Sequence, residues 1–325
     1  MVVILMAVGW AQSRAQNFYF TSGTGGIYKV SASGVTTTFV GQLVGNGLAL
    51  DTNGNVFVSA GASGGQIYKL TPSGSKTTFA SGLDVPCGLA FDSKGNLYEA
   101  DSGSGDINVF TPDGTMSLFA NFEGNPGDLA FDSKGNLYVT YPAANMILEV
   151  APNGTEITFA KQIQRPSCLA IDAHDDVFVT CLDHDDPPQI LEFGADATNQ
   201  QFAAELTSPA GLAFDSSGNL YVAEQLPANE ILQYTSNGNG TTFATGLNDP
   251  SVLKYQSAVS ITSLGLSASS VTGGTSATGT VTLSAPAPTG GATFTLTSSN
   301  ASATVLATVS VAAGASTGEQ VRRLR

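Results

Sequence analysis

The chain has 325 residues, of which 12 % are charged, and its formal net charge is −14 at pH 7. An acidic surface repels the phosphates of nucleic acids and of anionic membranes, so neither is an expected partner. A chain of this length can bury a large core without disulfides or structural metals, so size alone requires no cofactor. Abundant glycine and short apolar runs favour many brief strands over long helices.

The first residues have features of a secretory signal peptide. Residues 2–11 are mostly apolar, and Ser13 and Ala15 place small residues at the −3 and −1 positions of a cleavage site. A basic n-region is missing, which leaves a buried first strand as the alternative. The run is shorter than the about 20 apolar residues of a membrane span. We therefore expect residues 1–16 to be a signal peptide and the protein to be secreted, periplasmic or at the cell surface.

An eleven-residue phrase, Gly-Leu-Ala-Phe-Asp-Ser-Lys-Gly-Asn-Leu-Tyr at 88–98, recurs with small changes four more times. It predicts two short strands joined by a turn, in which the Asp accepts backbone hydrogen bonds and Gly95 takes a positive φ. Two more strands follow in each unit, and four strands in about 40 residues are typical of a propeller blade. The Asp residues that mark the units are Asp51, Asp92, Asp132, Asp172 and Asp215.

The two ends of the array complement each other. The segment from Asn17 matches the second strand of a unit that has no first strand, and Pro250–Tyr255 matches a first strand with nothing after it. Joining the two completes a sixth blade and removes exposed sheet edges. We therefore predict an all-β fold, with a six-bladed β-propeller at 17–256 closed by pairing of its N- and C-terminal strands.

The pattern Pro-x-Gly-Leu-Ala-Phe-Asp-x-x-Gly-Asn-Leu-Tyr-Val-Ala-Asp resembles the NHL repeat. It is similar to the wider gluconolactonase and streptogramin-lyase-like group of six-bladed propellers. That group includes lyases, lactonases and binding modules, so the resemblance implies a fold and leaves the activity open.

From residue 257 the composition changes to Ser, Thr, Ala and Gly, and strand-like alternation appears at 259–266, 278–283, 292–296 and 305–311. This segment resembles immunoglobulin-like repeats of bacterial surface proteins. Such a sandwich needs about seven strands, so we predict a partial Ig-like β-sandwich at 257–325. Its end, with Arg322, Arg323 and Arg325, is expected to be an irregular basic tail.

Ligands of propellers bind where loops converge at the mouth of the central channel. Counting from the turns places Asp101, Asp128 and Glu224 there, with Tyr141 alongside. Carboxylate oxygens are the ligands of calcium or magnesium, so these residues are the candidate metal ligands. The alternative is that the carboxylates are solvated or bind loop amides. The lactonases of the similar group bind a divalent ion centrally, but their Glu-Gly-Pro opening has no counterpart in this chain.

Three other residues are candidates at the mouth. His184 stands beside Asp183 in an acidic loop, where it could act as a general acid or base and Asp183 could contact a ligand. A solvated acidic loop is the alternative. Arg165 could pair with a substrate carboxylate or with a neighbouring Asp. Counting across the turn at Asp172 also places Cys168 opposite Cys181, within disulfide range.

Two functional hypotheses follow. The first is a monomeric, non-enzymatic binding module that uses the channel mouth to bind a protein, glycan or small molecule. The second is a divalent-metal-assisted lyase or lactonase at the same mouth, with Asp101, Asp128 and Glu224 as ligands and His184 as acid or base.

Overall fold

A computed structural model describes residues 5–7, 16–121, 123–182, 187–257, 261–266, 276–284, 292–298, 308–312 and 315–323. Regular structure in these residues is all β except for one 3-10 turn at Pro142–Ala144. Two compact units are present, and one of them comprises Asn17–Asp51 and Asn55–Gln256. None of the described residues belongs to a helix long and apolar enough to span a membrane.

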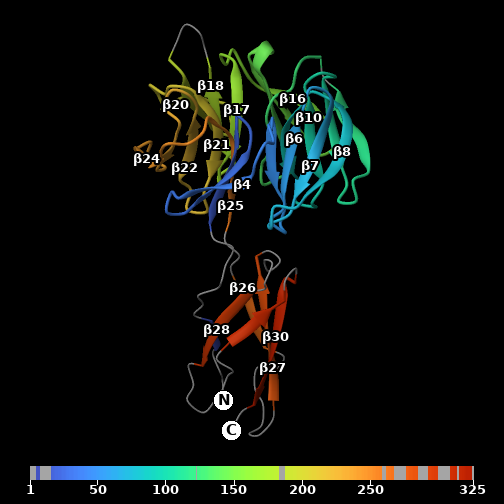
Figure 1. Cartoon of the computed structure of the whole chain (residues 1–325), viewed down its shortest axis with the longest axis vertical. Helices are drawn as coiled ribbons and strands as arrows, with labels where there is room; N and C mark the ends of the chain where they lie inside the picture. Colours follow the sequence, from blue (N-terminus) through green and yellow to red (C-terminus); the bar gives the residue numbers. More distant parts are fainter. Residues whose placement is uncertain are drawn as a thin grey trace. The chain divides into compact units, whose positions relative to one another are not determined.

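The larger unit contains four-stranded antiparallel sheets of the kind that build a β-propeller (Figure 1). We number them sheets 1 to 6 and give the strands of each from the inner strand outward. Sheet 1 comprises β25 (Pro250–Gln256), β2 (Asn17–Ser22), β3 (Ile27–Ser31) and β4 (Thr36–Val40). Sheet 2 comprises β5 (Gly47–Leu50), β6 (Val56–Ala60), β7 (Ser63–Leu70) and β8 (Lys76–Asp84). Sheet 3 comprises β9 (Pro86–Phe91), β10 (Leu97–Asp101), β11 (Asp106–Phe110) and β12 (Met116–Asn121).

Sheets 4 to 6 repeat the same order. Sheet 4 comprises β13 (Leu129–Phe131), β14 (Leu137–Tyr141), β15 (Met146–Val150) and β16 (Glu156–Lys161). Sheet 5 comprises β17 (Pro166–Ile171), β18 (Val177–Cys181), β19 (Gln189–Phe193) and β20 (Asn199–Ala203). Sheet 6 comprises β21 (Pro209–Phe214), β22 (Leu220–Glu224), β23 (Glu230–Tyr234) and β24 (Gly240–Ala244). The inner strands contact one another in the cyclic order β5, β9, β13, β17, β21, β25 and back to β5.

Sheet 1 joins the two ends of this unit. β2 pairs with β25 in antiparallel register, with Phe18 opposite Tyr255 and Phe20 opposite Leu253, and Figure 1 shows the opening blue strands beside the orange β25. The predicted pairing of the opening strand with the last strand is therefore confirmed. It covers the edge of β2 that would otherwise be exposed at the start of the repeats.

The predicted turn chemistry is also confirmed. The Asp92 carboxylate accepts hydrogen bonds from the backbone N–H of Lys94 (2.9 Å) and of Asn96 (2.8 Å), and its other oxygen accepts from the Asn96 side chain (2.8 Å). Gly95 has a φ of 85°, which glycine adopts without a steric penalty. These bonds account for the Asp-x-x-Gly-Asn pattern as a hairpin device.

An aromatic side chain on each second strand joins neighbouring sheets. Tyr98 meets Phe119 of its own sheet edge-on at 5.0 Å and Phe131 of the next sheet at 4.9 Å. Phe57 repeats this arrangement with Phe79 and Phe91. The residue before the turn Asp, which is Phe in three of the five turns, and the aromatic residue after the turn recur in the sequence because both pack between sheets.

The predicted register of the cysteines is wrong. The hairpin pairs Ile171 with Val177, where counting had paired Asp172, and a bulge in β17 adds a second one-residue shift, so that Pro166 lies opposite Cys181 in place of Cys168. The same shift recurs where Asp101 pairs with Pro86, so it belongs to the repeat and follows the Pro that begins the strand. Cys168 and Cys181 are separate thiols, and the Cys168 Sγ donates to the carbonyl of Ala210 in the next sheet at 2.7 Å.

The described part of the smaller unit forms two three-stranded sheets. The one contains β26 (Ile261–Leu266), β27 (Ser276–Leu283) and β30 (Thr317–Arg323), and the other contains β1 (Leu5–Ala7), β28 (Ala292–Ser298) and β29 (Thr308–Val311). Four of the strands lie where alternation predicted them. The predicted irregular tail is wrong for Thr317–Arg323, because this segment pairs with β27 along its whole length. Pairing of β1 with β28 matches the alternative of a first strand, and the signal peptide stays a prediction.

Candidate functional site

One end of the propeller, called the mouth face here, carries the ends of the second strands and the loops that lead from each sheet to the next. Asparagine side chains hold two of these loops. Asn145 Oδ1 accepts from the backbone N–H of Arg165 at 2.9 Å, and Asn229 Oδ1 accepts from that of Asp249 at 3.1 Å. Arg165 and Asp249 have φ values of 44° and 47° before a proline, where such a backbone is disfavoured. These bonds fix a loop conformation that would otherwise be unfavourable.

Two of the predicted metal ligands also hold loops. Asp101 is 4 % exposed, and its Oδ2 accepts from the N–H of Asp84 at 2.8 Å. Glu224 is 1 % exposed, and its Oε2 accepts from the N–H groups of Thr207 (2.8 Å) and Ser208 (2.9 Å). Burial raises the pKa of Glu224 while these backbone bonds lower it. The alternative interpretation, in which the carboxylates bind loop amides, is confirmed for both residues.

The third predicted ligand, Asp128, forms an ion pair across the ring of inner strands. Lys254 on β25 of sheet 1 places its Nζ 4.0 Å from Asp128 Oδ1, just before β13 of sheet 4 on the opposite side. The Asp128 carboxylate also accepts from the N–H groups of Leu129 (2.9 Å) and Leu169 (3.1 Å). Asp128 therefore links three sheets, and its charge is compensated by Lys254.

The predicted metal set is not brought within ligating distance. Among the described residues, the group with three ligand atoms within 4.8 Å of one another is Asp172, His174 and Asp176. It lies in the turn at the other end of sheet 5, where the Asp172 Oδ2 lies 3.1 Å from His174 Nδ1 and raises the pKa of His174. The residues placed at the mouth by counting are therefore not gathered into one set of ligands in this structure.

The structure separates the remaining candidates. Tyr141 ends β14 and is 1 % exposed; burial raises the pKa of its phenol. It therefore packs inside the propeller, whereas the predicted position was beside a ligand. Arg165 is exposed on the mouth face. Asp183 and His184 lie outside the described residues, so their roles stay predictions.

Sequence reasoning missed a buried polar pair in sheet 3. Glu99 on β10 is completely buried and accepts from the Asn108 side chain at 3.0 Å through Oε2, while its Oε1 has no partner among the described residues. Burial raises the pKa of Glu99 to about 8. The signal was present in the repeats, because the positions equivalent to Glu99 are apolar in the other sheets. They are Phe20, Val58, Val139, Val179 and Val222.

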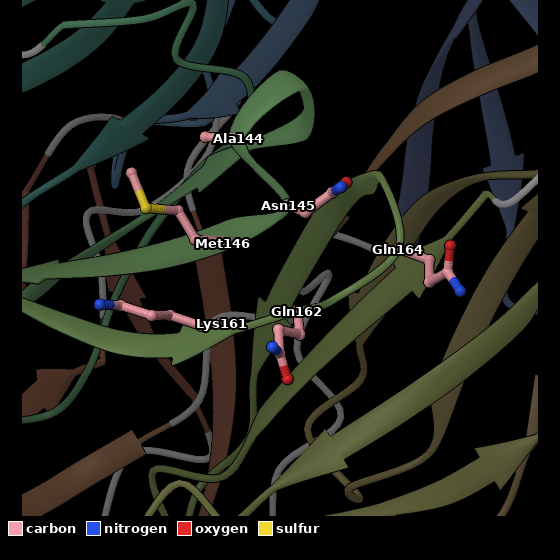
Figure 2. A pocket seen from close by; sticks show the side chains of 6 residues that line it. All are labelled: Ala144, Asn145, Met146, Lys161, Gln162 and Gln164. Atoms are coloured by element: carbon pink, nitrogen blue, oxygen red, sulfur yellow. The ribbon is translucent and has the colours of Figure 1, made fainter.

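A pocket of about 470 Å³ opens on the mouth face of sheet 4. Met146 at the start of β15 is paired with Lys161 at the end of β16, and both line it. Figure 2 shows these two residues on neighbouring strands, with Gln162 and Gln164 on the loop that follows Lys161. Ala144 and Asn145 complete the lining. The pocket presents one ammonium group and three amides on an acidic protein.

Residues 60–183 match the family model described as the SMP-30/Gluconolactonase/LRE-like region. Comparison with curated proteins found no match.

Several solved structures share the fold. A chain of a nidogen/laminin complex has a TM-score of 0.65 at 18 % identity, and the match covers 74 % of this chain and 98 % of that one. A streptogramin B lyase has a TM-score of 0.55 at 13 % identity, covering 76 % and 91 %. A gluconolactonase from Xanthomonas campestris has a TM-score of 0.56 at 14 % identity, covering 78 % and 91 %. At these identities the similarity establishes the β-propeller fold and no activity.

Proposed function

We propose that the protein is an exported six-bladed propeller that binds a protein, glycan or small molecule through its mouth face without transforming it. The observation that carries this proposal is the use of the mouth carboxylates. Asp101 and Glu224 hold loop amides and Asp128 pairs with Lys254, so all three stabilise the surface. Binding modules gain affinity when their loops are fixed before the ligand arrives.

The cyclic contacts of the inner strands support closure into six blades, and this leaves the loops as the variable part of the repeat. The partial Ig-like sandwich and export after cleavage near Ala15 are parts of the same proposal. The mass of the protein recovered from outside the cell tests export, and retention of residues 1–16 would contradict the signal peptide.

Calorimetric titration of the chelator-treated protein with calcium, magnesium and zinc tests the role of the carboxylates. We expect no binding at the mouth tighter than millimolar. Asp128→Ala is the matched variant. Tight binding that Asp128→Ala abolishes would contradict the proposal and would favour a metal centre at the mouth.

Binding itself is tested with arrays of defined oligosaccharides and peptides. Any ligand found should lose affinity on Arg165→Ala, which changes the mouth face, and keep it on Lys94→Ala, which changes an exposed turn at the other end. Binding that survives the mouth-face change and falls with the turn change would contradict the placement of the site.

A metal-assisted lyase or lactonase is the second candidate, and the family match over residues 60–183 favours it. It would use Asp101, Asp128 and Glu224 with His184 as acid or base. Assays with a sugar lactone and with a streptogramin B antibiotic distinguish the two candidates. Turnover that is lost in His184→Ala would establish the enzyme and overturn the binding module.

A further inference from the structure

The pocket on sheet 4 is distinguished by its positive charge. Lys161 lines it, and Arg165 follows the lining residue Gln164 by one position. Both side chains are exposed, and neither forms an ion pair with any residue that the structure describes. Two cations within five residues are unusual in a chain with a net charge of −14.

The other five loops of this type have no cation at either position. The residues equivalent to Lys161 are Gly41, Ser81, Asn121, Ala204 and Thr245. The residues equivalent to Arg165 are Gly45, Val85, Asn125, Ser208 and Asp249. Since the repeat is preserved without them, neither cation is needed to build the loop. The two cations are therefore a feature of this loop and not of the repeat.

The pocket is built on a fixed scaffold. Asn145 accepts from the Arg165 N–H, and its backbone carbonyl accepts from Ile163 at 3.1 Å. Asn229 holds Asp249 and Leu247 in the same way in sheet 6. Sheet 6 therefore has the same support with an acidic residue in place of Arg165, which separates the scaffold from the chemistry placed on it.

We propose that this pocket binds a carboxylate-bearing sugar residue of an acidic saccharide; the inference rests on the proposed binding function and names its ligand class. Lys161 provides a charge for the carboxylate, and Arg165, which follows the lining residue Gln164 in the sequence, adds positive charge to the same loop. The Gln162 and Gln164 amides donate and accept, as the hydroxyls of a sugar do, and Asn145, whose Oδ1 already accepts from the Arg165 N–H, adds its NH₂ donors. Met146 and Ala144 offer apolar contact to the ring.

The volume of about 470 Å³ suits a ligand of this size. An acidic peptide is the other anion to consider. Its carboxylate would pair with Lys161 and its backbone could bond the amides, but only a sugar acid places several hydroxyls around the ring that bears the carboxylate, within reach of one ammonium and several amides. The lining therefore favours the saccharide.

Calorimetry of the full chain with trigalacturonate tests the inference, and the methyl ester of the same trisaccharide serves as the neutral analogue. We expect trigalacturonate to bind and the ester to bind at least about tenfold more weakly, because esterification removes a charge-assisted pair. Lys161→Ala should weaken trigalacturonate to a similar extent. Thr245→Ala, at the equivalent position of sheet 6, should leave it unchanged.

Several outcomes would overturn the inference. The inference is wrong if trigalacturonate does not bind, if the acid and its ester bind equally, or if Lys161→Ala has no effect on trigalacturonate binding. It is also wrong if polyglutamate binds the pocket and trigalacturonate does not. Each leaves the proposed function standing if another ligand binds the mouth face. Conversion of trigalacturonate into an unsaturated or hydrolysed product, with the variant effects intact, would overturn the non-enzymatic function and keep the ligand class.

Discussion

Glu99 on β10 lies directly opposite Asn108 on β11, and the Asn108 amide donates to Glu99 Oε2 at 3.0 Å. The charged groups that act on Glu99 are Asp101 and Asp106, both acidic. With Oε1 buried and unpartnered among the described residues, the ionised carboxylate would be strongly disfavoured. The neutral acid is therefore the form that the folded protein holds near pH 7.

The first prediction concerns the pH dependence of stability. Burial raises the pKa of Glu99 from 4.5 to about 8 on folding, so between these values the folded state binds one more proton than the unfolded state. The contribution of Glu99 to the free energy of unfolding must therefore fall as pH rises through this window and level off above about pH 8. Glu99→Gln lacks this titration. Its stability relative to the wild type should rise by roughly 3–5 kcal/mol across the window.

Urea unfolding of both proteins between pH 4.5 and 9 measures this difference. Glu156→Gln, which changes an exposed carboxylate at the start of β16, is the control and should follow the wild type. Parallel curves for Glu99→Gln and the wild type would show that Glu99 titrates normally in the folded state.

The second prediction restores the apolar pattern of the other repeats. Glu99→Val with Asn108→Leu replaces the pair by residues found at the same places in sheets 4 to 6. Replacement of both polar groups should be neutral or stabilising by about 1–4 kcal/mol at pH 7. Glu99→Val alone leaves the Asn108 amide without its acceptor and should be less stable than the double variant by about 1–3 kcal/mol.

A double-mutant cycle in urea supplies the coupling between the two positions. Additive effects would mean that the hydrogen bond contributes nothing. A double variant well below the wild type in stability would show that the pair is needed for packing.

The third prediction tests the ion pair across the ring. The side chains of Lys254 and Asp128 are 21 % and 12 % exposed, and their charged atoms lie 4.0 Å apart. Lys254→Met keeps the aliphatic chain and removes the charge, and Asp128→Asn keeps the shape of the acceptor. We expect a coupling of about 0.5–1 kcal/mol between them that decreases in high salt. A coupling energy of zero at low salt would show that the ion pair does not stabilise the mouth face.

Sequence patterns predicted the sheets well because their determinants are local. Asp92 and Gly95 fix a hairpin within five residues, so the turn can be predicted wherever the motif recurs. The pairing of β2 with β25 followed from counting strands. The contacts of the candidate site residues were harder to predict from the sequence. Asp128 meets Lys254 only because their sheets stand opposite each other, and the bulge beside Cys181 depends on how a strand enters the ring. Neither relationship has a local sequence signal.

The last prediction concerns Asp175, which replaces the turn glycine in sheet 5 and has a φ of 68°. Its carboxylate accepts from the backbone N–H of Ser133 (2.8 Å) and from the Ser133 hydroxyl (2.9 Å), and it lies 3.4 Å from Lys134 Nζ. These bonds join the turns of sheets 4 and 5 and lower the pKa of Asp175. The stabilisation should therefore be complete above the unfolded pKa and be lost as pH falls through the lower folded value.

Three substitutions separate the backbone from the bonds. Asp175→Asn retains an acceptor and tolerates the left-handed backbone, Asp175→Gly retains only the backbone, and Asp175→Ala retains neither. We expect the Tm to decrease in that order by about 1–3 °C at each step at pH 7. The difference between the wild type and Asp175→Gly should shrink as pH falls below the unfolded pKa towards 3, because the stabilisation by the ionised carboxylate is progressively lost. A glycine variant as stable as the wild type at pH 7 would show that Asp175 contributes only its backbone conformation.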